Sequence, residues 1–494
     1  MKKLEPTSAT MVFPAAHINS PASMFGHTFL RINSKHNSKL LSYAVNYAAD
    51  ADPKKENGFS FAIKGLFGGY YGKYSLLPYY EKLKEYRDGE QRDIWEYDLN
   101  LNEEETKIML DHIWELNGTN SHYYFLTENC SYNMLWLIES ARPSISLRKY
   151  FYFEVMPLET IHALKEEGLI SQKYYRPSKR TVLLKYEKLL NSNNLIIPKK
   201  LLNGEISLQY LLDDKSIELE QKQYIFEAAI EFLEYSYKKN SMNKEDYLKL
   251  FYSLSMARAN LSKGKILEFN IPPNPIESHR AIRVTSGFGF RDKEQIGFIG
   301  IRPGYHDLED IQHGFLRGTQ IEFLNLELSY SKIKNEKIFQ IEEATILSIV
   351  SLAQRSEFFD SLSWRTKFGF DRDILQDNQA NFLASAGFGF SWGSKIGYIY
   401  TMFDPFAYLY NGISFGIGSS IGLIIDDFSW TNINIEGTSR IYDDSKIQYL
   451  LNLSQSINLS QNLELKFKYN YKSRYIDKIN QDEETFKVML NFYF

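Results

Sequence analysis

The spacing of apolar and polar positions changes along this chain of 494 residues, from mixed periods to a strict period of two after about residue 279. The last segment shows the alternation most clearly: apolar residues occupy positions 486, 488, 490, 492 and 494, and mostly polar residues lie between them. The segments Leu463–Lys472 and Phe382–Trp392 repeat the pattern. A period of two predicts β-strands that have one apolar and one polar face.

These strands are expected to form a transmembrane β-barrel over residues 276–494. The segments are ten or more residues long, are aromatic at their ends and are joined by polar turns, which is typical of such barrels. Leu490 is then expected to face lipid, and Lys487 and Asn491 the polar lumen. A soluble β-sandwich is the alternative, but its strands average five or six residues. We expect about twelve antiparallel strands, an even number that suits a single-chain barrel.

Residues 1–185 have the mixed pattern of an α+β domain. A hairpin is predicted from His27–Ile32, through a polar turn, into Leu40–Tyr47. Further on, Asn102 is followed by Glu105 and then by apolar residues at helical spacing. This arrangement predicts a helix that begins with a capping box, in which the two side chains satisfy each other's backbone N–H groups.

Residues 186–275 are rich in Lys and Glu at helical spacing, which predicts a small helical connector that ends in the linker Ile271–Pro275. No stretch reaches the ~18 apolar residues of a membrane-spanning helix. The residues after Met1 turn polar at once, so no signal-peptide core is expected within this chain. A net charge of -4 and a pI near 6.2 give no indication of nucleic-acid binding.

Cys130 is the only cysteine of the chain, and it lies where an extended aromatic stretch gives way to a helical run. A thiol at a helix N-terminus is favoured as thiolate by the helix dipole and by unpaired backbone N–H groups. His27 stands at the head of a predicted strand. A lone thiol and a histidine elsewhere in the chain are candidates for a nucleophile and its base, and a buried structural cysteine is the alternative.

An imidazole that acts as a base needs a third group to fix its tautomer. If the predicted hairpin is centred near residue 36, His27 falls opposite residue 46. Asn46 is therefore a candidate to orient His27, with the capping of a strand end as the alternative role.

Four further polar residues are candidates for substrate contacts, each with a structural alternative. His17 either lines the pocket or lies in an exposed loop. Glu128 and Asn129, next to the cysteine, either supply an oxyanion donor or a substrate contact, or form the turn. Arg92 pairs with a local carboxylate or with a substrate carboxylate or phosphate. We find no metal-binding motif and no glycine-rich nucleotide loop, so neither a metal nor a cofactor is expected.

Four motifs resemble the Lnb N-terminal periplasmic domain family: Pro21–Arg31, Gly69–Ser75, Arg92–Tyr97 and Glu128–Tyr132. The likeness covers about residues 8–180, and the family includes bacterial lipoprotein intramolecular transacylases. The order of histidine before cysteine, with Asn directly before Cys, is also similar to circularly permuted papain-like enzymes of the NlpC and lecithin retinol acyltransferase groups. The resemblance implies a papain-like fold in which Cys130 is the nucleophile and His27 the base.

The resemblance and the predicted barrel together imply an outer-membrane protein with its N-terminal domain in the periplasm. The implied activity is that of a thiol acyltransferase or hydrolase, which acts on lipid or lipoprotein acyl groups through a thioester. Known transacylases of the family carry membrane helices, whereas this chain carries a predicted barrel, so its enzyme would face a different membrane. A murein endopeptidase or amidase with the same Cys/His pair is one alternative, and a non-catalytic pore or binding protein is another. The sequence indicates no oligomeric state.

Overall fold

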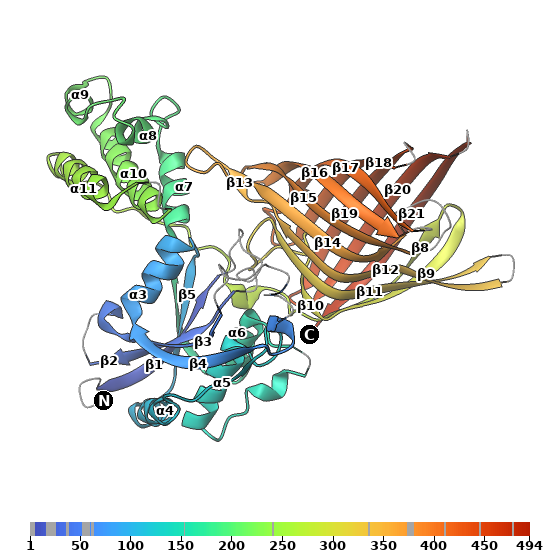
Figure 1. The fold of residues 1–494 in the computed structure, drawn as a ribbon, viewed down its shortest axis with the longest axis horizontal. Helices are drawn as coiled ribbons and strands as arrows, with labels where there is room; N and C mark the ends of the chain where they lie inside the picture. The colour runs from blue at the N-terminus through green and yellow to red at the C-terminus, as the bar shows by residue number, and fades with distance from the viewer. Residues whose placement is uncertain are drawn as a thin grey trace. The chain divides into compact units, whose positions relative to one another are not determined.

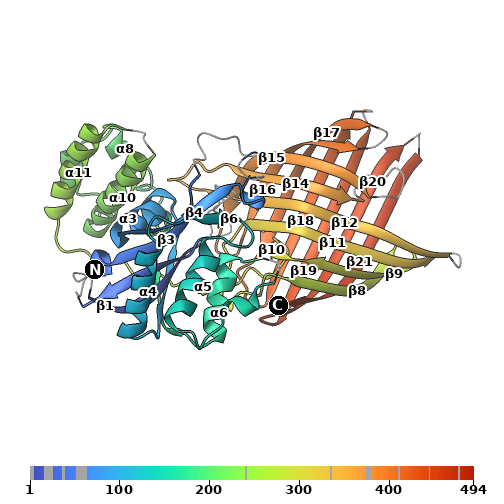
Figure 2. The same cartoon turned by 60° about the horizontal axis from the view of Figure 1, so that its bottom comes forward.

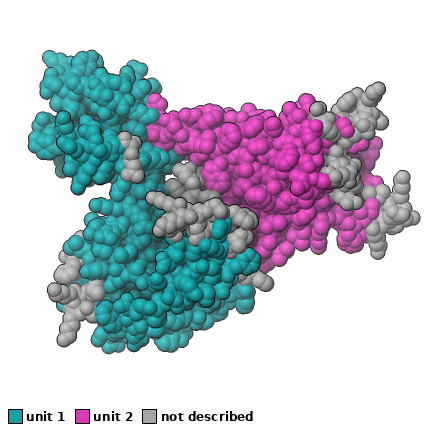
Figure 3. Space-filling view, in the orientation of Figure 1, with its two compact units in different colours: residues 1–17, 26–271 teal, residues 18–25, 272–494 magenta. Residues whose placement is uncertain are grey.

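The computed structural model describes residues 5–15, 26–35, 39–51, 60, 64–152, 154–239, 242–333, 336–372, 380–409, 412–443, 446–476 and 479–494. These residues fall into two compact units, of which the first runs to Ile271 and the second begins at Pro272 (Figure 3). Within the described part of the chain, no helix is long and apolar enough to cross a membrane.

A seven-stranded antiparallel sheet forms the centre of unit 1, with strand order β6-β4-β3-β2-β1-β5-β7 (Figure 1). Its strands are β1 (Pro6–Pro14), β2 (Phe29–Ser34), β3 (Tyr43–Ala49), β4 (Tyr70–Pro78), β5 (Ile94–Leu99), β6 (Ser121–Tyr123) and β7 (Ile170–Arg176). The predicted hairpin is β2–β3, but its register differs from the prediction. Leu30 pairs with Val45, so each residue of β2 pairs with a residue of β3 that lies two positions closer to the C-terminus than predicted. Because side chains alternate with a period of two, this shift leaves each one on the predicted face.

Helices cover both faces of this sheet and confirm the predicted α+β fold. They are α3 (Tyr79–Leu83), the π-helix η2 (Lys84–Gly89), α4 (Glu103–Glu115), α5 (Cys130–Ala141) and α6 (Pro157–Glu166), with short 3-10 turns η1 (Lys39–Leu41) and η3 (Arg148–Tyr150). The capping box of α4 is present: Asn102 Oδ1 accepts from the Glu105 N–H at 2.9 Å, and Glu105 Oε2 accepts from the Asn102 N–H at 2.9 Å. On the face of α3 and η2, the buried core is formed by Val12, Phe29, Ala44, Tyr79, Leu83, Tyr86 and Ile94.

The predicted helical segment is also present, and it belongs to the same compact unit as the sheet. Its helices are α7 (Lys179–Leu189), α8 (Ile197–Leu202), α9 (Leu208–Asp213), α10 (Leu219–Lys238) and α11 (Lys244–Ala259). The Lys179 ammonium at the start of α7 binds Glu231 at 2.5 Å and also Glu234, both on α10. This ion pair joins α7, which directly follows β7 of the sheet, to α10.

Unit 2 is a closed antiparallel barrel of twelve strands among the described residues, as the alternating pattern predicts (Figure 2). The strands are β8 (Arg283–Arg291), β9 (Glu294–Arg302), β11 (Thr319–Ile333), β12 (Glu336–Ser351), β14 (Ser363–Asp371), β15 (Asn381–Gly393), β16 (Gly397–Leu409), β17 (Ile413–Ile425), β18 (Thr431–Tyr442), β19 (Ile447–Ser460), β20 (Leu463–Ile476) and β21 (Ile479–Tyr493). Pairing of β9 with β11 closes the ring. Short strands β10 (Gly304–His306) and β13 (Gln354–Arg355) attach to it, and the 3-10 turn η4 (Pro275–Glu277) precedes it.

The two faces of the barrel follow the alternation of the sequence. On β21, Lys487 and Asn491 line a lumen cavity of about 340 Å³. Phe486 and Phe492 on the same strand point outward, and each remains 41% exposed. An apolar outer face and a polar inner face are the arrangement that a membrane barrel requires, because the outer side chains meet hydrocarbon.

Ion pairs connect the walls of the lumen. Arg365 on β14 binds Asp404 on β16 at 2.5 Å and Glu436 on β18 at 2.7 Å. On the other side, Arg372 binds Glu342 of β12 and Glu483 of β21, each at 3.2 Å. The cavity is thus lined by cations and anions that largely neutralise each other.

A chain segment crosses the lumen just after β10. We call residues 307–312 the crosspiece. Its carbonyl groups are held by the far wall: Asn432 Nδ2 on β18 donates to Leu308 O and to Asp310 O, both at 2.7 Å, and Ser456 Oγ on β19 donates to Glu309 O at 2.7 Å. The crosspiece therefore spans the barrel from β10 to the opposite strands at the end where the chain enters.

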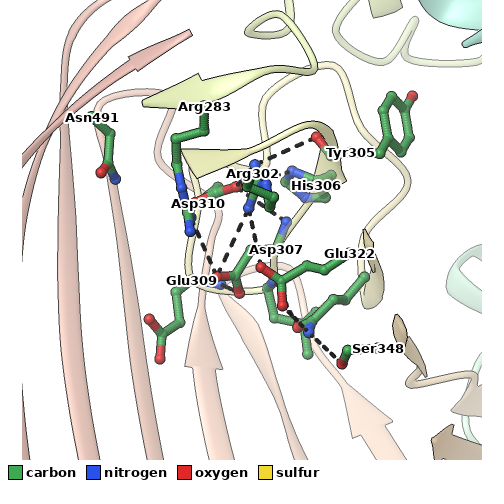
Figure 4. A network of polar contacts seen from close by, with 12 residues as sticks. Arg283, Arg302, Tyr305, His306, Asp307, Glu309, Asp310, Glu322, Ser348 and Asn491 are labelled. Atoms are coloured by element: carbon green, nitrogen blue, oxygen red, sulfur yellow. Dashed lines mark hydrogen bonds and ion pairs between the residues drawn. The ribbon is translucent and has the colours of Figure 1, made fainter. Parts of the chain in front are cut away.

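The Asp310 carboxylate is the centre of the crosspiece's polar contacts (Figure 4). It binds Arg302 at 2.7 Å, Lys466 at 2.9 Å and Arg283 at 3.1 Å. Asp310, His279 and His306 place ligand-type atoms within 4.8 Å of one another, a spacing compatible with a metal ion. Three cations already share the Asp310 carboxylate, however, so we interpret this cluster as the anchor of the crosspiece.

The barrel orientation predicts that arginine substitutions at two adjacent residues near the middle of β15 differ in their cost to stability. Ala386 is exposed on the outer face, whereas Ser385 lines the lumen cavity. Ala386→Arg should destabilise the refolded barrel by roughly 2–4 kcal/mol, because a guanidinium would enter hydrocarbon. Ser385→Arg should destabilise the refolded barrel by much less, because its guanidinium would enter the polar lumen. Equilibrium unfolding in detergent or lipid, followed by heat-modifiable migration on gels, measures both. Equal costs for the two variants would contradict a lipid-facing outer surface.

Candidate active site

Cys130 is the first residue of α5, and its thiol is 5% exposed. The helix begins at this residue because Asn129 caps it: Asn129 Oδ1 accepts from the N–H groups of Ser131 at 3.0 Å and Tyr132 at 3.2 Å. The Cys130 N–H donates to the Tyr123 hydroxyl at 3.1 Å. The sulfur thus lies at the positive end of a capped helix, as the sequence predicts.

His27 connects Cys130 to Asn46. The His27 Nε2 atom lies 2.9 Å from Asn46 Oδ1, which as a carbonyl oxygen accepts the Nε2–H. This leaves Nδ1 for the contact with Cys130, whose thiol hydrogen-bonds the same imidazole. The structure therefore brings the three residues proposed from the sequence into one chain of contacts, Cys130–His27–Asn46.

The pKa values of the pair indicate a thiolate beside an imidazolium. Burial raises the pKa of the Cys130 thiol, but the charge and hydrogen bond of His27 outweigh it and lower the pKa to about 6. Burial lowers the pKa of His27, whereas Cys130 and Asn46 raise it, with the net result above the ordinary value. The hydrogen bonds of Tyr123 and Ser131 act on Cys130 in the same direction as His27.

Three residues that the sequence analysis did not single out hold this pair. The Tyr86 ring from the π-helix lies 5.6 Å from the His27 ring, between centroids, so the imidazole is fixed between Tyr86 and Asn46. Ser131 Oγ lies 3.7 Å from the Cys130 sulfur and accepts from Thr28 Oγ1 at 2.8 Å. Ser131 and Tyr123 are close to the cysteine in sequence, whereas nothing in the sequence marks Tyr86.

The other predicted site residues have different surroundings. Besides capping α5 with Oδ1, Asn129 donates from Nδ2 to Phe125 O at 3.0 Å and to Val155 O at 2.7 Å. Both the oxygen and the nitrogen of its side-chain amide are therefore used in hydrogen bonds to the backbone. Glu128 is exposed to solvent. Arg92 is 3% exposed and binds Glu90 at 2.5 Å. His17 lies outside the described residues.

An apolar rim, residues 64–69, packs on the segment that leads to Cys130. The Phe125 N–H donates to Gly65 O at 2.9 Å, and the contact with the Phe125 ring is so close that a Cβ on Gly65 would lie 2.2 Å from it. Leu66 and Phe67 stay 43% and 76% exposed. Large apolar side chains are therefore presented to solvent beside the approach to the thiol.

Two family models match parts of this chain. Residues 1–167 match the model of the Lnb N-terminal periplasmic domain. This part of the chain is an Lnb N-terminal periplasmic domain. Residues 272–493 match a second family, described as a domain of unknown function (DUF7840). An Lnb periplasmic domain joined to a closed barrel with an apolar outer face fits an outer-membrane protein.

Solved structures that are similar to this chain include two porins and an outer-membrane channel, each over less than half of this chain. The NanC porin is 9% identical, with a TM-score of 0.28, over 43% of this chain and 100% of its own. The KdgM porin is 8% identical, with a TM-score of 0.26, over 43% and 99%. An outer-membrane channel from Pseudomonas putida F1 is 10% identical, with a TM-score of 0.30, over 47% and 100%. Comparison with curated proteins gives no match.

The thiolate–imidazolium pair predicts a specific pH profile for alkylation. The rate of iodoacetamide reaction at Cys130 should rise with pH through a midpoint of about 6, since only the thiolate reacts. In His27→Ala the burial remains and the positive partner is lost. The midpoint should therefore move above about 8.5, the ordinary value of a free thiol.

Two variants complete this experiment. Asn46→Ala should raise the midpoint by less than His27→Ala, because it loosens the imidazole without removing it. Ser140→Ala, at the other end of α5, is the control and should leave the midpoint unchanged. Superimposable profiles for the unmodified protein and His27→Ala would remove His27 from this role.

Proposed function

We propose that the Lnb domain is a cysteine-dependent acyltransferase or hydrolase that acts on lipid or lipoprotein acyl groups at the periplasmic side of the outer membrane. The observation that carries this proposal is the buried Cys130 thiol at the start of α5, in contact with an imidazole that Asn46 orients. The same contact lowers the pKa of the thiol to about 6. A structural cysteine in an apolar core would instead have a raised pKa.

The geometry supports a two-step acyl transfer. The Cys130 thiolate attacks the carbonyl carbon of an ester, and the C–O bond of the leaving alcohol breaks as His27 gives it the proton from Nδ1. The product is a thioester on Cys130. His27 then takes a proton from an amine or a water, which attacks the thioester carbon and releases the thiolate.

The carbonyl oxygen becomes negative in each step and needs hydrogen-bond donors. The Cys130 N–H and the Tyr123 hydroxyl are 3.1 Å apart beside the sulfur, and both are donors to such an oxyanion once their mutual hydrogen bond is released. Asn129 acts indirectly, because it fixes the start of α5. Ser131 Oγ lies 3.7 Å from the sulfur, so it acts by holding the sulfur in place and takes no part in the proton transfer. We assign them positioning roles.

The apolar rim favours an acylated lipid over peptidoglycan as substrate. Leu66 and Phe67 expose apolar surface next to the Tyr124–Phe125 stretch, on which long acyl chains can lie. A murein endopeptidase or amidase would use the same Cys130 and His27 on a peptide bond, and its substrate would need polar side chains along this approach.

Acyl transfer predicts a covalent intermediate that mass spectrometry detects. Incubation of the full chain with a diacyl ester lipid, in the absence of an amine acceptor, should add the mass of one acyl group to Cys130. Hydroxylamine should remove it, as expected for a thioester. Cys130→Ala should show no adduct and should unfold within about 1 kcal/mol of the unmodified protein, since one small side chain changes.

A muropeptide offered in place of the lipid tests the alternative. An adduct from the muropeptide and none from the lipid would assign the pair to peptidoglycan. An intact fold, a reactive thiol and no adduct from either substrate would argue against acyl transfer.

The crosspiece bears on the non-catalytic alternative, a pore. Because residues 307–312 cross the lumen and are tied to β18 and β19, we expect them to obstruct the lumen at the end where the chain enters the barrel. The unmodified protein is therefore expected to give no steady conductance in a planar bilayer. Replacement of residues 307–312 by a Gly-Ser linker should produce channel steps. Equal conductance of both proteins would show that the crosspiece does not seal the lumen.

A further inference from the structure

Arg92 is an unusual buried cation near the candidate active site. Its side chain is 3% exposed, and one nitrogen, Nη2, binds Glu90 at 2.5 Å. The Nε and Nη1 atoms are buried and have no hydrogen-bond partner within the described chain. Buried guanidinium N–H groups without a partner are costly, so such an arrangement calls for an additional ligand.

Ring contacts place Arg92 close to the proposed base. The Arg92 guanidinium carbon lies 5.3 Å from the centroid of the Tyr86 ring, and that ring lies 5.6 Å from the His27 ring. Tyr86 therefore separates the guanidinium from the imidazole by one aromatic side chain. The positive charge of Arg92 lowers the pKa of His27, although burial, Cys130 and Asn46 have larger effects on it.

The backbone around Arg92 is held in a strained form. Tyr86 belongs to the π-helix η2, and the Arg92 N–H donates to Tyr86 O at 2.9 Å, which closes the following turn. Between them Gln91 has φ of 59°, in the left-handed region. Strain of this kind persists where the surrounding structure must fix a functional side chain.

We infer that Arg92 binds the phosphate of a glycerophospholipid and thereby selects a phospholipid as the acyl donor of Cys130. This inference rests on the proposed acyl transfer. A guanidinium is suited to phosphate because it stays charged and offers several N–H donors. The same chain carries a membrane barrel, so membrane phospholipids are the donors at hand. A neutral acylglycerol would leave the Nε and Nη1 atoms of Arg92 without a hydrogen-bond partner.

Binding is tested separately from chemistry with lipids that cannot transfer an acyl group. The full chain in detergent is titrated with a dialkyl-ether phosphatidylglycerol and with the matching neutral dialkylglycerol, and the dissociation constants are measured by calorimetry. The phosphate lipid should bind at least about tenfold more tightly, as expected for one charge-assisted contact. Arg92→Gln should abolish this preference and leave the affinity for the neutral lipid unchanged.

Matched variants distinguish binding from folding. Arg87→Gln, on the same π-helix, removes a guanidinium whose Nε donates to Pro177 O at 2.9 Å, and it should keep the full preference. Glu90→Gln frees Nη2 and should tighten binding of the phosphate lipid several-fold. Arg92→Lys keeps the charge and should retain part of the preference, so the inference is tested even if Arg92→Gln fails to fold.

Three outcomes overturn the inference. An unchanged preference in Arg92→Gln, or loss of affinity for both lipids alike, would make Arg92 a structural residue. Inorganic phosphate that binds as tightly as the phosphate lipid, with the same dependence on Arg92, would make free phosphate the ligand. A parallel assay with the ester lipid reports acylation of Cys130. If the Arg92-dependent preference is present and no thioester forms, the proposed acyl transfer fails and the phosphate site stands.

Discussion

Backbone hydrogen bonding in hydrocarbon is the constraint on which the C-terminal half of the chain depends. No water is available there, so each strand needs a partner on both sides, and the pairing of β9 with β11 supplies the last one. Closure then separates two environments. The outer face must be apolar, and the inner face becomes a small compartment in which charged side chains must pair with one another, as Arg365 does with Asp404 and Glu436.

The strands could be predicted from the sequence because alternation is a local signal. On β21 the polar residues Lys487 and Asn491 share one face of the alternation, which is why Lys487 lies where expected, although the apolar Met489 also lines the lumen cavity. The crosspiece could not be predicted, since Asn432 and Leu308 are 124 residues apart and their contact depends on closure. The β2–β3 register was predicted wrongly by two residues because the polar turn alone does not set the loop length.

The candidate site also combines residues that could be predicted from the sequence with residues that could not. Cys130 at the start of a helix follows from the residues around it, and Asn46 follows from a hairpin, which limits the possible partners of His27. Tyr86 belongs to a π-helix that the sequence does not indicate, and its contact with His27 depends on the tertiary fold. Asn129 illustrates a different limit: a residue next to a nucleophile can be needed for the cap alone.

The anchoring of Asp310 also has a mechanical consequence for the barrel. The barrel's first strand, β8, pairs with its last strand, β21, and this pairing is the seam of the barrel. Arg283 on β8, Arg302 on β9 and Lys466 on β20 all hold the same Asp310 carboxylate, so one side chain bridges the seam from inside. Lateral separation of β8 from β21 would also break the contacts of Asp310 on one side of the seam, either with Arg283 and Arg302 or with Lys466. The Asp310 contacts thereby stabilise the barrel wall at the β8–β21 seam against lateral opening into the bilayer.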